Sequence, residues 1–132
     1  MKSVVISRHK LLPAQETALQ ALGAEVVEIC EQYNPKVDNP RWEAQGVDAV
    51  FTVALPPSLL ASLCGPFRVF IFEMESVGTT TDEAEAQRWC AEKPELRSYL
   101  PALEGSLRLM EFQAVYELKI AIQTTRVWSA QS

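Results

Sequence analysis

The feature that most constrains this chain is the alternation of apolar extended runs with helical segments along its first half. Four short runs are rich in β-branched and aromatic residues: residues 3–7 (SVVIS), 24–30 (AEVVEIC), 48–54 (DAVFTVA) and 67–72 (FRVFIF). Runs of this length and composition are typical of strands, and those over residues 3–7 and 48–54 are typical of buried strands. Strands that alternate with helices predict an α/β fold, with a parallel sheet of about four strands and helices flanking it.

Proline and glycine mark where the intervening helices begin and end. Pro13 can occupy the first turn of a helix that Gly23 ends, and Pro57 opens a short helix before Gly65. Residues 31–46 are polar and contain several turn-forming residues, so we expect a loop there with one helical turn near 41–45. The spacing Thr80-x-x-Glu83 is a capping box and predicts a helix over residues 81–92.

The pattern changes after residue 96. Glu104-Gly105 is a turn signal between two apolar segments, and residues 116–122 alternate between apolar and polar side chains. Alternation with a period of two indicates strands with one wet and one dry face. We therefore expect one domain over residues 1–132, in which residues 96–132 form a C-terminal extension of antiparallel strands. A length of 132 residues is that of a single typical domain.

Composition excludes several function classes. The chain has 12 Lys+Arg against 17 Asp+Glu, a net charge of −5, which argues against binding a long nucleic acid. No apolar run approaches the ~20 residues of a membrane-spanning helix, and we expect no secretory leader. Cys30, Cys64 and Cys90 lack the CxxC spacing of metal sites. They predict reduced thiols in a cytoplasmic protein, with catalytic use of one of them as the weaker alternative.

The strongest candidate site is the segment after the first predicted strand. In open α/β sheets, ligands bind beyond the carboxyl ends of the parallel strands. Ser7, Arg8, His9 and Lys10 bring a hydroxyl, a guanidinium, the only imidazole of the chain and an ammonium to that position. These groups are typical donors to phosphate, and the following helix N-terminus favours an anion. The alternative is a solvated polar loop.

A second candidate segment follows the third predicted strand. Ala54, Leu55 and Ser58 lie where a helix begins, so that free backbone N–H groups can contact an anion. The glycine-rich fingerprints of dinucleotide and nucleoside triphosphate sites are absent. A plain connection between strand and helix explains these residues better than a specific site does.

The third candidate segment follows the fourth predicted strand and contains Glu73, Glu75, Ser76, Thr79 and Thr80. The two carboxylates can serve as a general acid or base, or orient the cationic groups of the first segment. With a histidine they could also hold a divalent cation, but we expect no metal here. The hydroxyls suit a phosphate, whereas helix capping alone would explain the last threonine.

Two segments resemble small CRISPR-associated Rossmann-fold proteins of the CARF type, the type III accessory proteins and cyclic-oligoadenylate ring nucleases. The first is VVISRHKLLPAQETALQALGAEVV, with Ser7, Arg8, His9, Leu12 and Gln15 at the matching positions. The second is VFTVALPPSLLASLCGPFRVFIF. Together they cover roughly the first 75 residues of the chain.

The resemblance implies a cytoplasmic, CARF-like, Rossmann-like protein that binds a cyclic oligoadenylate second messenger, as a homodimer with the ligand on the two-fold axis. It also implies metal-independent cleavage, in which a ribose 2′-OH attacks the neighbouring phosphodiester and no cofactor takes part. Arg8 would stabilise the transition-state charge, and His9 would act as acid, base or phosphate donor. The alternatives are a sensor or sponge that holds the nucleotide intact, and an interaction protein that pairs through its C-terminal strands.

Overall fold

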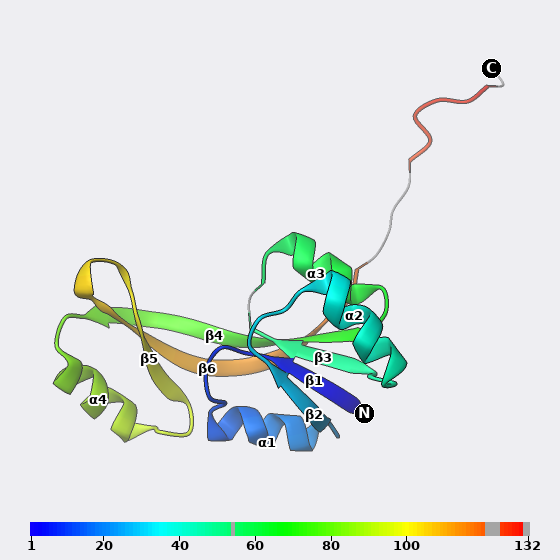
Figure 1. The fold of residues 1–132 in the computed structure, drawn as a ribbon. Coiled ribbons are helices and arrows are strands. Elements are labelled where there is room, and N and C mark those ends of the chain that lie inside the picture. The colour runs from blue at the N-terminus through cyan, green and yellow to red at the C-terminus, as the bar shows by residue number, and fades with distance from the viewer. Residues whose placement is uncertain (54, 121–124, 131–132) are drawn as a thin grey trace.

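The computed structural model describes residues 1–53, 55–120 and 125–130 (Figure 1). Along the chain the elements are β1 (Lys2–Ile6), α1 (Pro13–Ala21), β2 (Glu25–Cys30), α2 (Pro35–Ala44), β3 (Ala49–Thr52), α3 (Pro57–Cys64), β4 (Arg68–Thr80), α4 (Glu83–Glu92), β5 (Arg97–Pro101), a short 3-10 turn (Leu103–Gly105) and β6 (Leu107–Leu118). No helix in these described ranges is long and apolar enough to cross a membrane. The α/β class predicted from the alternation is confirmed.

The strands form one six-stranded mixed sheet in the order β2-β1-β3-β4-β6-β5. The first four strands of this order pair in parallel, whereas β6 pairs antiparallel with both β4 and β5. The sequence therefore predicted both the parallel strands of the first half and the antiparallel strands of the second. The turn expected at Glu104-Gly105 is present, and both residues adopt a positive φ.

The core has two halves because successive side chains of a strand point to opposite faces of the sheet. Val4, Val50 and Val69 belong to one buried cluster, which also contains Trp42 of α2 and Leu63 of α3. The other cluster contains neighbouring strand residues, such as Val5 and Phe51, packed with Leu19 of α1. Figure 1 shows the same layers, with α2 and α3 on one side of the sheet and α1 on the other.

The helix α2 corrects the expectation of a loop over residues 31–46. Asn34 caps it by accepting a hydrogen bond from the Lys36 N–H, and Pro35 occupies its first turn. Pro40 within the helix and the weak amphipathic pattern hide it from sequence analysis. Its stability comes from the tertiary structure, because Trp42 is fully buried between the helix and the sheet.

The strand β4 continues to Thr80, beyond the end predicted at Phe72. The polar residues after Phe72 are in the strand because β6 supplies them with backbone hydrogen-bonding partners, from Glu73 opposite Ala114 to Thr80 opposite Leu107. The helix after β4 also starts slightly later than predicted. Asp82, not Thr80, is its N-cap and accepts a hydrogen bond from the Ala84 N–H. Residues 121–124, which include part of the predicted alternation, lie outside the described residues.

An ion-pair network attaches α2 to the edge strand β2. The Arg41 guanidinium donates to both carboxylate oxygens of Glu28. It also donates to the Asp38 carboxylate, with 2.9 Å between nitrogen and oxygen. These hydrogen bonds hold the pKa of the Glu28 carboxyl below its ordinary value, and they raise the pKa of Arg41. The Glu28 side chain is about a quarter exposed, so solvent screens the pair only in part.

The lowered pKa of Glu28 predicts a stability change in acid. A carboxyl with a depressed folded pKa stabilises the fold above its unfolded pKa, and this contribution is lost as the pH falls through the folded pKa. We expect Glu28→Gln to lower the free energy of unfolding by more at pH 7 than at pH 3. Urea denaturation of the variant and the unmodified protein at both pH values measures this difference in the free energy of unfolding. Glu43→Gln, at an exposed position of α2, is the matched control. An equal loss at both pH values would contradict the prediction.

Candidate functional site

The path of the chain creates a crevice at the carboxyl ends of the parallel strands. From β1 the chain passes through α1 to β2, and from β2 it passes through α2 to β3 on the other side of β1. The helices α1 and α2 therefore cover opposite faces of the sheet. The loops after the neighbouring strands β1 and β3 consequently lead to opposite faces and diverge from each other. In α/β sheets, ligands bind at such a point of reversal.

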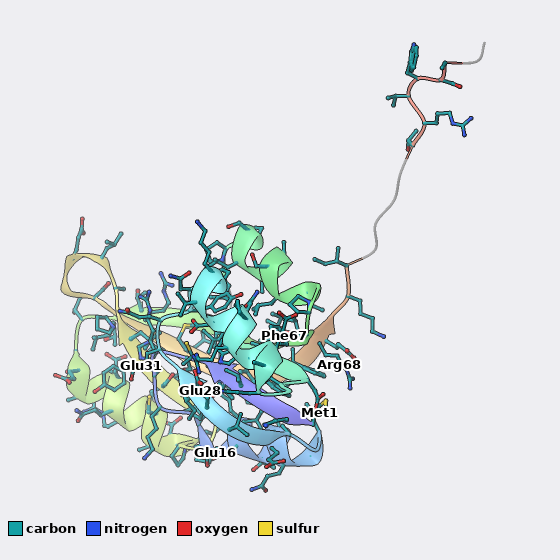
Figure 2. The ribbon with its side chains drawn as sticks, turned by 45° about the vertical axis from the view of Figure 1, so that its right-hand side comes forward. Met1, Glu16, Glu28, Glu31, Phe67 and Arg68 are labelled. Carbon is teal, nitrogen blue, oxygen red and sulfur yellow. The ribbon has the colours of Figure 1, made fainter. Side chains whose placement is uncertain are left out.

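A cavity of about 600 Å³, the large cavity, lies at this point. Ser7, Arg8 and His9 from the loop after β1 line it, together with Glu31 and Tyr33 from the loop after β2. Gln32 of the same loop also lines it. The other lining residues, from the ends of β1 and β3, the start of α3 and β5, are Ile6, Thr52, Val53, Leu55, Pro56, Leu59 and Leu100. In Figure 2 Glu31 lies at the opposite end of the sheet from Met1 and Arg68, as expected for the carboxyl ends.

A second cavity of about 220 Å³, the small cavity, adjoins the first. Ser7, His9, Val53 and Leu100 line both cavities, so they form the boundary between them. The small cavity is bounded on one side by Lys10 and the start of α1. On the other side it is bounded by residues of the antiparallel half of the sheet, which are Met74, Ser98, Tyr99, Leu100 and Met110.

The loop of residues 7–10 has a fixed backbone. The Ser7 N–H donates to the Cys30 carbonyl at 2.9 Å, which anchors the loop to the end of β2. The Ser7 hydroxyl donates to the His9 carbonyl at 2.7 Å and accepts from the His9 N–H at 3.2 Å. Arg8, His9 and Lys10 are exposed, and neither Arg8 nor Lys10 makes an ion pair with any described residue. Two unpaired cations thus stand at the mouth of the crevice.

The walls of the large cavity add an aromatic ring and one carboxylate. The Tyr33 ring stacks on Trp42 with 5.5 Å between ring centroids, and its hydroxyl donates to Asn39 at 2.7 Å. Burial raises the pKa of the Tyr33 hydroxyl, which therefore stays neutral. Glu31 is the acidic residue among the lining groups, and it opposes the cations of the 7–10 loop in sign. This mixed charge suits a small ligand with localised negative charge better than a long polyanion.

The structure brings together all four residues of the first predicted segment and one residue of the second. Ser7, Arg8, His9 and Lys10 line one or both cavities, as does Gln15 of α1. Leu55 lines the large cavity, whereas Ser58, in the first turn of α3, lines neither. Ala54 lies outside the described residues.

The third predicted segment is not part of the crevice. Glu73, Glu75, Ser76, Thr79 and Thr80 line neither cavity, because β4 continues through them and carries them along the antiparallel half of the sheet. Glu73 instead interacts with Tyr116 across the sheet and raises the pKa of that phenol. Thr80 donates to the Glu85 carboxylate at 3.0 Å. Glu73 and Thr80 therefore bind partners within the fold, and none of the five residues shares a cavity wall with Arg8 or His9.

Sequence reasoning missed two groups of lining residues. Glu31, Gln32 and Tyr33 follow the second parallel strand, and the rule applied to the other strands would have found them. Met74, Ser98 and Met110 carry no local signal, since they reach the small cavity only through the pairing of β4, β5 and β6. In the part of the chain that the structure describes, no cluster of three or more metal-ligating side chains occurs.

The three cysteines do not take part in the site. Cys30, Cys64 and Cys90 are free thiols, and none of them lines either cavity. Burial raises the pKa of each thiol, which disfavours the nucleophilic thiolate. They are best interpreted as small packing residues.

Comparison of the chain with protein families, curated proteins and solved structures gave no match.

Proposed function

We propose that the crevice binds a small phosphate-bearing nucleotide, with its phosphates beside the 7–10 loop. The observation that carries this proposal is the position of Arg8 and Lys10: two exposed cations without ion-pair partners among the described residues, beside two adjoining cavities. A guanidinium donates two parallel hydrogen bonds to phosphate oxygens, and an ammonium adds a mobile charge. The anchored backbone of Ser7 keeps these side chains at the cavity mouth.

Within this class, the proposed ligand is a cyclic oligoadenylate. Its support is the resemblance of residues 4–27 and 50–72 to the CARF-like ring nucleases, together with the parallel strand order β2-β1-β3-β4, which suits a Rossmann-like half. A compact cyclic ligand also fits an acidic chain, because only the local charge at the 7–10 loop must favour binding. A homodimer would place two such loops around one ligand.

The proposed reaction is metal-independent cleavage of one phosphodiester. The ribose 2′-oxygen loses its proton and attacks the adjacent phosphorus, while the bond to the 5′-oxygen breaks and that oxygen gains a proton. The products are a 2′,3′-cyclic phosphate and a free 5′-hydroxyl. His9 would accept the first proton or donate the second, and Arg8 would stabilise the negative charge on the phosphoryl oxygens. Positioning of the 2′-oxygen in line with the leaving oxygen would supply the remaining part of the rate acceleration.

The test is incubation of the protein with labelled cyclic tetra-adenylate and cyclic hexa-adenylate, with and without EDTA, followed by chromatography. Linear products that form equally in EDTA support cleavage. Intact ligand that stays bound to the protein shows a sensor or sponge instead. Absence of binding at micromolar protein would overturn both and favour an interaction protein. In that case the candidate interaction surface is β6, because β5 pairs with residues 107–111 and, among the described residues, no strand pairs with this edge at residues 113–118.

Removal of one cation should weaken binding in a salt-dependent way. We expect Arg8→Ala to raise the Kd for the cyclic oligoadenylate by about tenfold or more, since hydrogen bonds to charged groups contribute about 1.5–3 kcal/mol. The remaining affinity should depend less on salt, because one fewer cation contacts phosphate. Calorimetric titration at two salt concentrations measures both effects.

The control for this variant is Arg88→Ala, which removes the same charge from an exposed position of α4. It should leave the Kd and its salt dependence unchanged. Equal weakening by the two substitutions would show that Arg8 acts only through the net charge of the protein.

A further inference from the structure

We infer that the small cavity is a binding pocket for the adenine ring of the nucleotide, with the Gln15 side-chain amide as its hydrogen-bond donor. This inference rests on the proposed function, because it assigns the base of the same ligand whose phosphates lie beside the 7–10 loop. It concerns side chains of α1, β4 and β6 that the proposed phosphate site does not use.

Gln15 is buried, but its hydrogen-bonding capacity is not satisfied. Its side chain is only 5 % exposed, at the start of α1. The Oε1 oxygen accepts a hydrogen bond from the Leu12 N–H at 2.9 Å, which fixes the orientation of the amide. The Nε2 group contacts the Met74 sulfur at 3.7 Å, a weak acceptor, and no other described group accepts from it. A buried amide N–H without a good acceptor is unfavourable, so this group suits a ligand atom with a lone pair.

The apolar part of the small cavity's wall is suited to a flat ring, whereas Ser98 and Tyr99 add polar groups. Met74 and Met110 line it from neighbouring strands, along with Leu12 and Val53. The pairing of Met74 with Phe112 and of Met110 with Ser76 places both thioethers on the same face of the sheet. Methionine sulfur makes favourable contacts with aromatic rings and its flexible side chain adapts to their shape.

The size and position of the cavity indicate a base and not a whole nucleotide. A volume of about 220 Å³ is below the ~300–1,000 Å³ of pockets that hold a complete drug-sized ligand. Ser7 and His9, together with Val53 and Leu100, lie between it and the large cavity. A ring in the small cavity would therefore have its ribose and phosphate beside the 7–10 loop. Adenine offers ring nitrogens as acceptors for the Gln15 amide.

Methionine methyl groups report on this pocket directly. The chain has three methionines, and Met1 lies beside Arg68 at the opposite end of the sheet (Figure 2). In protein labelled with ¹³C at the methionine methyls, we expect adenosine to shift the signals of Met74 and Met110 and to leave Met1 unmoved. Ribose 5-phosphate, which has no base, should leave all three signals unmoved.

A pair of variants tests the donor. Gln15→Glu keeps an oxygen to accept from the Leu12 N–H but removes the Nε2 donor, and we expect it to weaken adenosine binding about tenfold. Gln20→Glu makes the same charge change at an exposed position of α1 and should bind adenosine as the unmodified protein does. A thermal melt shows whether both variants are folded. Equal affinities in the two variants would show that Gln15 only caps the helix.

The outcomes separate the pocket from the proposed function. If cyclic tetra-adenylate binds but moves neither Met74 nor Met110, and adenosine moves neither, the pocket assignment is wrong and the phosphate site stands. If adenosine moves both signals but no cyclic oligoadenylate binds, the cavity is a nucleoside site and the proposed ligand is wrong.

Discussion

His9→Ala is expected to abolish most cleavage of a cyclic oligoadenylate while the protein still binds it. A positioned general acid or base contributes ~10²–10⁴-fold to a rate, so the single-turnover rate should fall by about that factor. The Kd should change little, because Arg8 and Lys10 supply the phosphate contacts. His9 is suited to this role because its backbone is fixed by Ser7 while its ring stands exposed between the two cavities.

The measurement is a single-turnover chromatographic assay with a parallel binding titration. Since His9 is the only histidine in the chain, no second imidazole can replace it. Lys10→Ala is the matched control: it removes a neighbouring side chain of the same loop, and it should affect binding more than the rate of the bound complex. An unchanged rate in His9→Ala would remove the histidine from the chemistry. Equal loss of binding and rate would reduce it to a positioning residue.

Trp42→Ala is expected to cause the largest loss of stability of any substitution considered. Trp42 is fully buried between α2 and the sheet, stacked on Tyr33 and in edge contact with Phe67 at 6.1 Å between ring centroids. Truncation of a buried tryptophan to alanine lowers the free energy of unfolding by about 3–5 kcal/mol. Because domains are stable by only ~5–15 kcal/mol, this is a large part of the total. The loss also affects the large cavity, of which Tyr33 is a wall.

Urea denaturation measures the effect, with Trp128→Ala as the control. Trp128 is 78 % exposed near the C-terminus, so its truncation should leave the denaturation midpoint unchanged. Trp42→Phe should retain part of the packing, so its denaturation midpoint should lie between those of Trp42→Ala and Trp128→Ala. A Trp42→Ala protein with an unchanged midpoint would show that α2 is not held by this side chain.

The sequence predicted well those elements whose signals are local. The β-branched run before Ser7, Pro13 at the first turn of α1 and Gly23 after its end define a β-α-β unit, and the structure has each of them in place. The position of Ser7, Arg8 and His9 also followed from one rule, that ligands bind where parallel strands end. That rule needs only the strand boundaries, and the continuous β-branched run of β1 supplies the boundary before this loop.

The expectations that were wrong depend on partners distant in the sequence. Residues 73–80 are mostly polar, and the sequence predicts a loop there, at the crevice. They belong to β4 because β6 pairs with them along its length. Likewise α2 contains Pro40 and has little amphipathic pattern, and it is held by the burial of Trp42 and by the ion pair of Arg41 with Glu28. Local propensity cannot show these interactions, because each needs a partner from another element.

The sequence alone therefore determined the α/β class, the parallel pairing of the first strands and the cationic loop at their carboxyl ends. Only the tertiary structure decided that the loop stands between two cavities, and that the small cavity has walls of Met74 and Met110 opposite the buried amide of Gln15. The reason is physical. Periodicity and turn residues act within a few neighbours along the chain. A cavity, in contrast, is formed by side chains whose proximity is fixed by strand register and packing across the whole sheet.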